Sequence, residues 1–121
     1  MTSNSRNNRP VRQDRDRDDE PRSSSRRSRQ RLDEEVVALR DRGQSYSAVA
    51  GALGLKRAVD AQEAFIRAMR SLSEADGRAL RGREMGRLDQ LEARIRSRDA
   101  EQPEKMERHL NALAALRESM G

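Results

Sequence analysis

The feature that most limits what this chain can fold into is the near absence of apolar side chains before Leu32. Met1 and Val11 are the sizeable apolar residues of the first 31 positions, which otherwise consist mainly of Asn, Ser, Arg, Asp and Pro. Such a segment buries too little surface to offset the entropy lost on ordering. We therefore predict a disordered, arginine-rich tail over residues 1–31 and a folded part confined to residues 32–121.

The folded part has few large side chains from which to build a core. The chain has one Phe, one Tyr and no Trp, and 39% of its residues are charged. A core of Leu, Val, Ile, Met and Ala is typical of small helical proteins. The predicted fold class is therefore all-α.

Several classes of chemistry are excluded by residue types that the chain lacks. Cysteine is absent, which excludes disulfides, iron–sulfur clusters and thiolate zinc sites. The one histidine, His109, has no cluster of carboxylates nearby in the sequence, so we expect it to be neither a metal ligand nor catalytic. No phosphate-binding glycine loop or nucleophile motif is present. We expect no enzyme activity, no cofactor and no metal site.

Apolar residues recur at helical spacing in three segments between residues 32 and 72. The first helix is expected over 32–42, where Gly43 ends it in a left-handed conformation. Ser45 is expected to cap a short helix over 46–53. Gly54, which permits a backbone conformation that is costly for other residues, breaks it before a third helix over 56–72. Two helices joined by so short a turn are typical of a helix-turn-helix, which we assign to residues 32–72.

Two longer helices are predicted in residues 73–121. Ser73 and Asp76 form a plausible capping box at the start of this part, and Gly77 interrupts it, so we expect a joint within residues 71–82. The first helix then runs to about residue 98, and the second is opened by Pro103. The apolar stripe of the first helix is Leu80, Met85, Leu88, Leu91 and Ile95, and that of the second is Met106, Leu110, Leu113, Leu116 and Met120. The two helices are interpreted as an antiparallel hairpin with one apolar edge. That edge packs against the first three helices or against a second copy, so a homo-oligomer through these helices is an open alternative.

The string DRGQSYSAVAGALGLKRAV resembles the helix-turn-helix of homeodomain-like bacterial and phage DNA-binding proteins. The resemblance rests on Gly43, Ser45, Ala50, Leu53-Gly54, Leu55 and Lys56-Arg57. Asp60 stands where that family has an aliphatic core residue. The order of segments is also loosely similar to small terminase-like and actinobacterial proteins. In the family the recognition helix enters the major groove, so the resemblance implies that Lys56 and Arg57 contact duplex DNA.

Other residues are candidates for contact with DNA by their position relative to this motif. Arg67 lies later on the same helix and is interpreted as a phosphate contact or as an exposed filler. Tyr46 either touches a phosphate or packs its ring over the turn. The arm before the first helix of homeodomain-like proteins enters the minor groove. This assigns nucleic-acid contact to four tail residues: Arg26, Arg27, Arg29 and Arg31.

The net charge of +5 arises in the tail, because residues 1–31 hold ten Arg against five acids and residues 32–121 hold sixteen of each sign. The leading prediction is a DNA-binding protein, either a transcriptional regulator or a phage-type DNA-packaging or nucleoid protein. The balanced charge of residues 32–121 supports an alternative, a helical adaptor that binds a protein partner of the transcription or translation machinery. RNA binding through the tail is a third alternative, although the chain lacks the aromatic platforms that are common in RNA-binding modules.

No apolar run approaches the roughly 20 residues of a membrane span, so we expect a cytoplasmic protein of a bacterium or phage.

Overall fold

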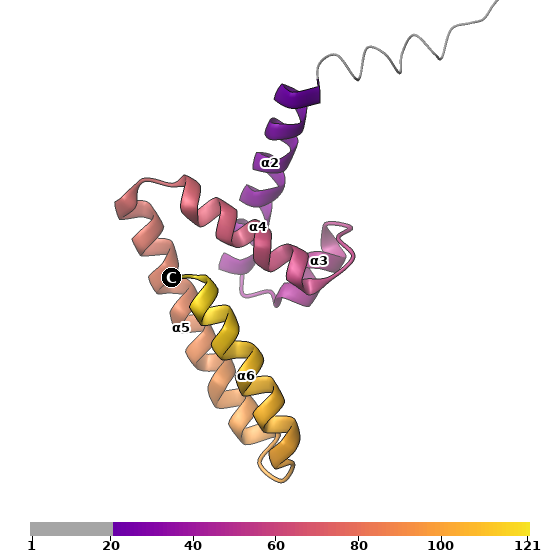
Figure 1. The fold of residues 1–121 in the computed structure, drawn as a ribbon, viewed down its shortest axis with the longest axis vertical. Helices are drawn as coiled ribbons and strands as arrows, with labels where there is room; N and C mark the ends of the chain where they lie inside the picture. The colour runs from indigo at the N-terminus through magenta and orange to yellow at the C-terminus, as the bar shows by residue number, and fades with distance from the viewer. Residues whose placement is uncertain (1–20) are drawn as a thin grey trace, which may run out of the picture.

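The computed structural model describes residues 21–121, with side chains described from Ser25 onward, and this part of the chain is all-α as predicted. Residues 21–121 form five helices and no strand: α2 (Pro21–Asp41), α3 (Tyr46–Ala52), α4 (Ala58–Ser71), α5 (Glu74–Arg98) and α6 (Pro103–Ser119). The first three gather at one end of the molecule, and α5 and α6 lie side by side and extend away from them (Figure 1). None of the helices formed by the described residues is long and apolar enough to cross a membrane.

Helix α2 begins well before the predicted start at Leu32. The expected disorder of residues 1–31 is wrong for residues 21–31, which form the first turns of α2, whereas residues 1–20 lie outside the described part of the chain. Pro21 suits the first helical position, and no Gly or Pro follows it until Gly43. Extending a helix that is already nucleated costs far less than starting one. Leu32 instead marks the residue at which α2 starts to be covered by the rest of the fold.

The turn between α3 and α4 is longer than predicted. Gly54 adopts the expected left-handed conformation, with φ of +73°, but α4 begins at Ala58 rather than at Lys56. The backbone N–H of Arg57 donates to Asp60 Oδ2 at 3.1 Å, and this contact fixes the first turn of α4. Asp60 is thus the capping carboxylate, and the neighbouring Ala61 is the buried residue of this turn.

Helix α5 runs without the interruption expected at Gly77. Ser73 Oγ accepts from the N–H of Asp76 at 3.2 Å and caps the helix as predicted. A Cβ at Gly77 would lie 3.0 Å from the carbonyl oxygen of Met69, so the missing side chain lets α5 approach the end of α4 closely. The joint lies at Leu72 and Ser73, between α4 and α5. The interruption expected at Gly77 is wrong because a glycine costs a helix interior only about 1 kcal/mol, and tight packing offsets that cost.

The core of α2, α3 and α4 is centred on α4. Its residues Ala61, Ala64 and Phe65 are fully buried, and the helix packs against α2, α3 and α5. Phe65 meets the ring of Tyr46 edge to face, with ring centroids 6.1 Å apart and planes at 85°. Small residues on α4 allow the helices to approach closely around this single aromatic pair.

The end of α6 is tied back to the start of α5. Leu113 and Met120 are buried, and Arg81 Nε donates to the carbonyl oxygen of Met120 at 3.0 Å. Pro103 occupies the first turn of α6, as predicted. The apolar stripe of α6, on which the alternative of a homo-oligomer was based, is therefore partly covered within the chain itself.

A buried carboxylate, Asp99, joins α5 to α6. Its side chain is fully buried, and it accepts from Arg98 Nε at 3.0 Å and contacts His109 Nδ1 at 2.7 Å. The hydrogen bond from Arg98, with a second contribution from His109, lowers the pKa of Asp99 to about 2. His109 therefore has a structural contact in the fold and, together with Arg98, holds the turn between the two helices.

We expect Asp99 to contribute to the acid sensitivity of the fold. An Asp in an unfolded chain has a pKa of about 3.9, which is above the folded value. The ionised carboxylate therefore stabilises the fold above about pH 4, and this stabilisation is lost as the pH falls toward 2. Between about pH 4 and pH 6 the urea midpoint of the wild type should exceed that of Asp99→Asn by a constant amount, and the difference should shrink below about pH 4. A difference that is the same at all pH values would contradict this role.

Candidate nucleic-acid interface

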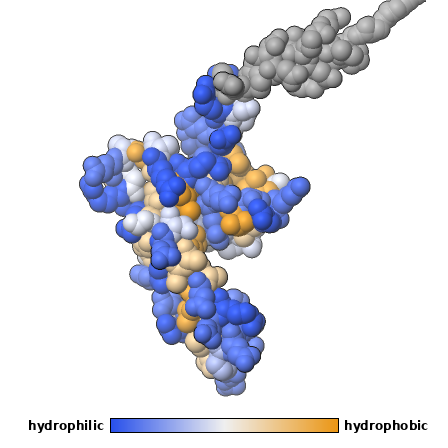
Figure 2. Space-filling model, viewed as in Figure 1, coloured by the Kyte–Doolittle hydropathy of each residue, from blue (hydrophilic) through white to orange (hydrophobic). Residues whose placement is uncertain are grey.

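The excess positive charge of the chain lies on the exposed beginning of α2. Residues 1–20 hold five Arg and five acids, whereas residues 21–31 hold five Arg and no acid. Every side chain from Ser25 to Arg31, here called the arginine segment, is exposed. This part of α2 projects from the body of the protein (Figure 1), and its surface is hydrophilic (Figure 2). It presents four predicted site residues on one helix: Arg26, Arg27, Arg29 and Arg31.

Two further predicted residues, Lys56 and Arg57, lie in the turn that precedes α4. Both are exposed, and the side chain of Arg57 is 69% exposed. The Arg57 guanidinium donates to Asp60 Oδ1 at 3.1 Å, so part of its charge is neutralised by its own helix. Lys56 makes no ion pair with a residue that the structure describes. Of the two, Lys56 is the better placed for a phosphate.

Arg67 is occupied by a contact between α2 and α4. Its Nε and Nη2 donate to the two carboxylate oxygens of Asp33 at 3.1 and 2.9 Å, while its side chain stays 42% exposed. This paired geometry fixes the guanidinium against α2. Arg67 is therefore not an exposed side chain without a partner, and its main contact, with Asp33, joins α4 to α2.

Tyr46 is buried, with 7% of its surface exposed, so its ring packs in the core rather than over an open turn. Its hydroxyl donates to Glu84 Oε2 at 2.7 Å. Burial, with the hydrogen bond to Glu84 as the next cause, raises the pKa of Tyr46 far above its usual range. The hydroxyl is therefore not available to a phosphate.

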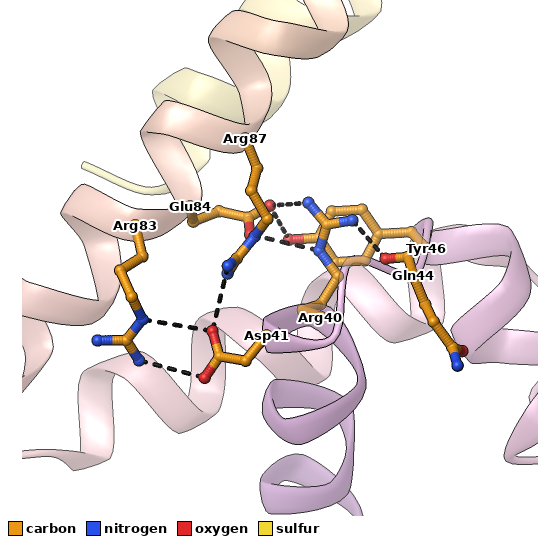
Figure 3. A network of polar contacts seen from close by, with 7 residues as sticks. All are labelled: Arg40, Asp41, Gln44, Tyr46, Arg83, Glu84 and Arg87. Atoms are coloured by element: carbon orange, nitrogen blue, oxygen red, sulfur yellow. Dashed lines mark hydrogen bonds and ion pairs between the residues drawn. The ribbon is translucent and has the colours of Figure 1, made fainter.

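The residue that receives the Tyr46 hydroxyl belongs to a network that sequence reasoning missed. Glu84, fully buried on α5, also accepts from Arg40 of α2 and from Arg87 Nε at 2.9 Å (Figure 3). The Arg40 guanidinium lies 4.0 Å from the centre of the Tyr46 ring. One signal was present in the sequence: Glu84 lies midway between Leu80 and Leu88, on the buried stripe of α5.

A second carboxylate extends the network to the surface. Asp41, at the end of α2, accepts from Arg83 Nε and Nη2 at 3.3 and 3.2 Å and from Arg87 Nη1 at 3.1 Å. Arg87 thus joins both carboxylates (Figure 3). The network fixes α5 to α2 and α3 and sets the direction in which α5 and α6 leave the other helices.

The accessible face of α4 carries no excess charge. Its charged residues are Asp60, Glu63, Arg67 and Arg70. Two of each sign leave α4 neutral, so cations that attract a polyanion are concentrated on the arginine segment. Groups of carboxylates and histidines that would suit a metal ion are absent from residues 21–121.

Comparison with known proteins gives no relative: no protein-family model, no curated protein and no solved structure matches this chain.

Proposed function

We propose that this protein binds duplex DNA without catalysing a reaction and that the arginine segment supplies most of the affinity. The observation that carries the proposal is the cluster of four exposed arginines in the arginine segment, at the projecting beginning of α2, where residues 21–31 contain no acid. Arginine side chains on such a helix neutralise phosphates and release counterions. Lys56, exposed in the turn before α4, adds a contact from the body of the protein.

In this proposal α3 and α4 form a helix-turn-helix, and α4 lies at the DNA. The Ser45 cap, the left-handed Gly54 and the close packing of α4 on α3 support it. Phosphate contacts carry no sequence information, and the face of α4 is neutral with mixed charges. The protein should therefore bind DNA with low sequence selectivity, which fits a packaging or nucleoid role better than a selective regulator.

The proposal is tested by removing the charge of the arginine segment. In the full chain, replacing Arg26, Arg27, Arg29 and Arg31 by Gln should weaken binding to a random duplex by at least about a hundredfold at low salt. Each lost phosphate contact should also lower the slope of log affinity against log salt by about 1. A fluorescence polarisation titration at several salt concentrations measures both.

The matched control removes four exposed arginines from α5 and α6. The variant with Arg78, Arg94, Arg96 and Arg108 replaced by Gln has the same net charge as the first variant. It should keep the wild-type salt slope. Equal losses in the two variants would mean that net charge alone, and not the arginine segment, attracts the DNA, and the proposal would fail.

A protein-binding role is the second candidate. A groove between α2 and α4 favours it, because apolar side chains line the floor of the groove and a phosphate backbone would gain nothing from contact with them.

A further inference from the structure

A groove runs along the base of the arginine segment, between α2, the end of α4 and the start of α5. Its volume is about 720 Å³, within the range of about 300–1,000 Å³ that is usual for binding sites. Apolar side chains line its floor, among them Val37, Leu72 and Leu80. Leu72 is 44% exposed there, and Val59 is the other large apolar residue exposed among those that the structure describes. The floor thus offers apolar surface to a partner.

Cations surround this floor on two sides. Arg26 and Arg29 lie along the α2 side, and Arg67 and Arg70 lie along the α4 side. Arg67 is held by Asp33, and Arg70 makes a long contact of 3.4 Å to the carbonyl oxygen of Ser119. Arg26 and Arg29 make no ion pair with a residue of the described part of the chain. Two acids, Asp33 and Glu34, also line the groove, so its rim has four arginines against two carboxylates and a net positive charge.

Helix geometry separates the groove face of α2 from its other side. Arg26, Arg29, Asp33 and Val37 follow one another at three- and four-residue steps and all line the groove. Gln30 and Glu34 also line the groove, so Arg27, three residues before Gln30, lies at the edge of this face; Arg31 lies farther from it, and neither Arg27 nor Arg31 lines the groove. The arginine segment can thus present Arg27 and Arg31 to a phosphate backbone while Arg26 and Arg29 face the groove.

We propose that this groove binds an acidic amphipathic helix of a partner protein. Leucine-like side chains of the partner would cover Leu72 and Val37, and carboxylates beside them would pair with Arg26, Arg29 and Arg70. Recognition of an amphipathic helix by an apolar groove is a common mode, with anchors at i, i+3, i+4 and i+7. A nucleic acid suits the groove less well, because its lining residues include no aromatic side chain on which a base could stack.

The test uses the full chain and a fluorescein-labelled peptide of about four helical turns, with leucines at i, i+3, i+4 and i+7 and glutamates around them. Two control peptides replace the glutamates by lysines or the leucines by serines. The first peptide should bind at least about tenfold more tightly than either control. Absence of saturable binding up to about 100 µM, or equal binding of the lysine peptide, would overturn the proposal.

Paired variants place the peptide on the protein. The double variant Arg26→Glu with Arg29→Glu should lower the affinity for the peptide by at least about tenfold, and so should Leu72→Asp alone. The controls are Arg27→Glu with Arg31→Glu, two residues of α2 that do not line the groove, and Val59→Asp at the far end of α4. Each control should change the affinity for the peptide by less than about threefold. Circular dichroism of every variant checks that the fold is retained.

Three outcomes would assign the groove to another occupant and overturn the proposal. Duplex DNA that displaces the peptide from the Arg27 and Arg31 variant as well as from the wild type would place nucleic acid in the groove. A wild-type dimer that Leu72→Asp converts to a monomer would place a second copy there. A gain of more than about tenfold in peptide affinity on deleting residues 1–20 would place the chain's own N-terminus there.

Discussion

Replacing Glu84 by Gln is expected to lower the free energy of unfolding by at least about 3 kcal/mol, because removal of one charge from a buried ion pair leaves its partners uncompensated. Glu84 is fully buried, and its two oxygens receive Arg40, Arg87 and the hydroxyl of Tyr46. A neutral amide offers one acceptor oxygen in place of two and cannot balance the guanidinium of Arg40. Urea unfolding followed by circular dichroism measures the loss.

The matched control for Glu84 is Glu92→Gln in the same helix. Glu92 also contacts two arginines, Arg96 at 3.0 Å and Arg117 at 2.9 Å, but on the surface. Solvent screens such pairs, so this substitution should have a much smaller effect. Equal losses in the two variants would show that burial of the Glu84 network is unimportant for stability.

Replacing Phe65 by Ala is expected to cost about 3–5 kcal/mol, as is usual when a buried aromatic ring is removed. Phe65 is fully buried at the centre of α4, and it makes the edge-to-face contact with Tyr46. The neighbouring side chains Ala61 and Ala64 are too small to fill the space that the ring leaves. Urea unfolding gives the loss directly.

Val59→Ala is the control for Phe65 because Val59 lies on the same helix but is 37% exposed. Its substitution should change stability by no more than about 0.5 kcal/mol. If Phe65→Ala costs less than about 1 kcal/mol, the aromatic pair is not the centre of the core.

The sequence predicted those parts of the fold that local chemistry decides. Gly43 and Gly54 take the expected positive φ values, Ser45 and Ser73 cap their helices, and Pro103 opens α6. Each of these depends on one residue and its near neighbours. The all-α class followed from helical spacing of small apolar residues and the scarcity of aromatic ones.

The parts that failed depend on partners distant in the sequence or on competition between close alternatives. Arg40 and Glu84 are 44 positions apart, and each looks like a surface charge when its own helix is considered alone. The start of α4 was predicted near Lys56, and Asp60 was interpreted as a departure from the core pattern. Its carboxylate instead caps the first turn of α4 by accepting from the N–H of Arg57. The beginning of α2 was missed because disorder was inferred from composition, whereas a helix continues from its packed part.

The residues of the candidate interface were predicted from the sequence, but their arrangement in space was not. The cationic residues before Leu32 were identified, yet their place on a projecting helix, and the division of that helix between a groove face and an outer face, required the structure. Tyr46 and Arg67 proved to be engaged by Glu84 and Asp33, which no spacing rule reveals.

The most direct test of DNA binding by the arginine segment is a titration of the full chain with a random duplex over a series of salt concentrations. If Arg27, Arg31 and Lys56 contact phosphates, log affinity should fall against log salt with a slope of about −3 or steeper. The slope should also be the same for duplexes of unrelated sequence. Absence of binding at low salt, or a slope near zero, would contradict the proposed function.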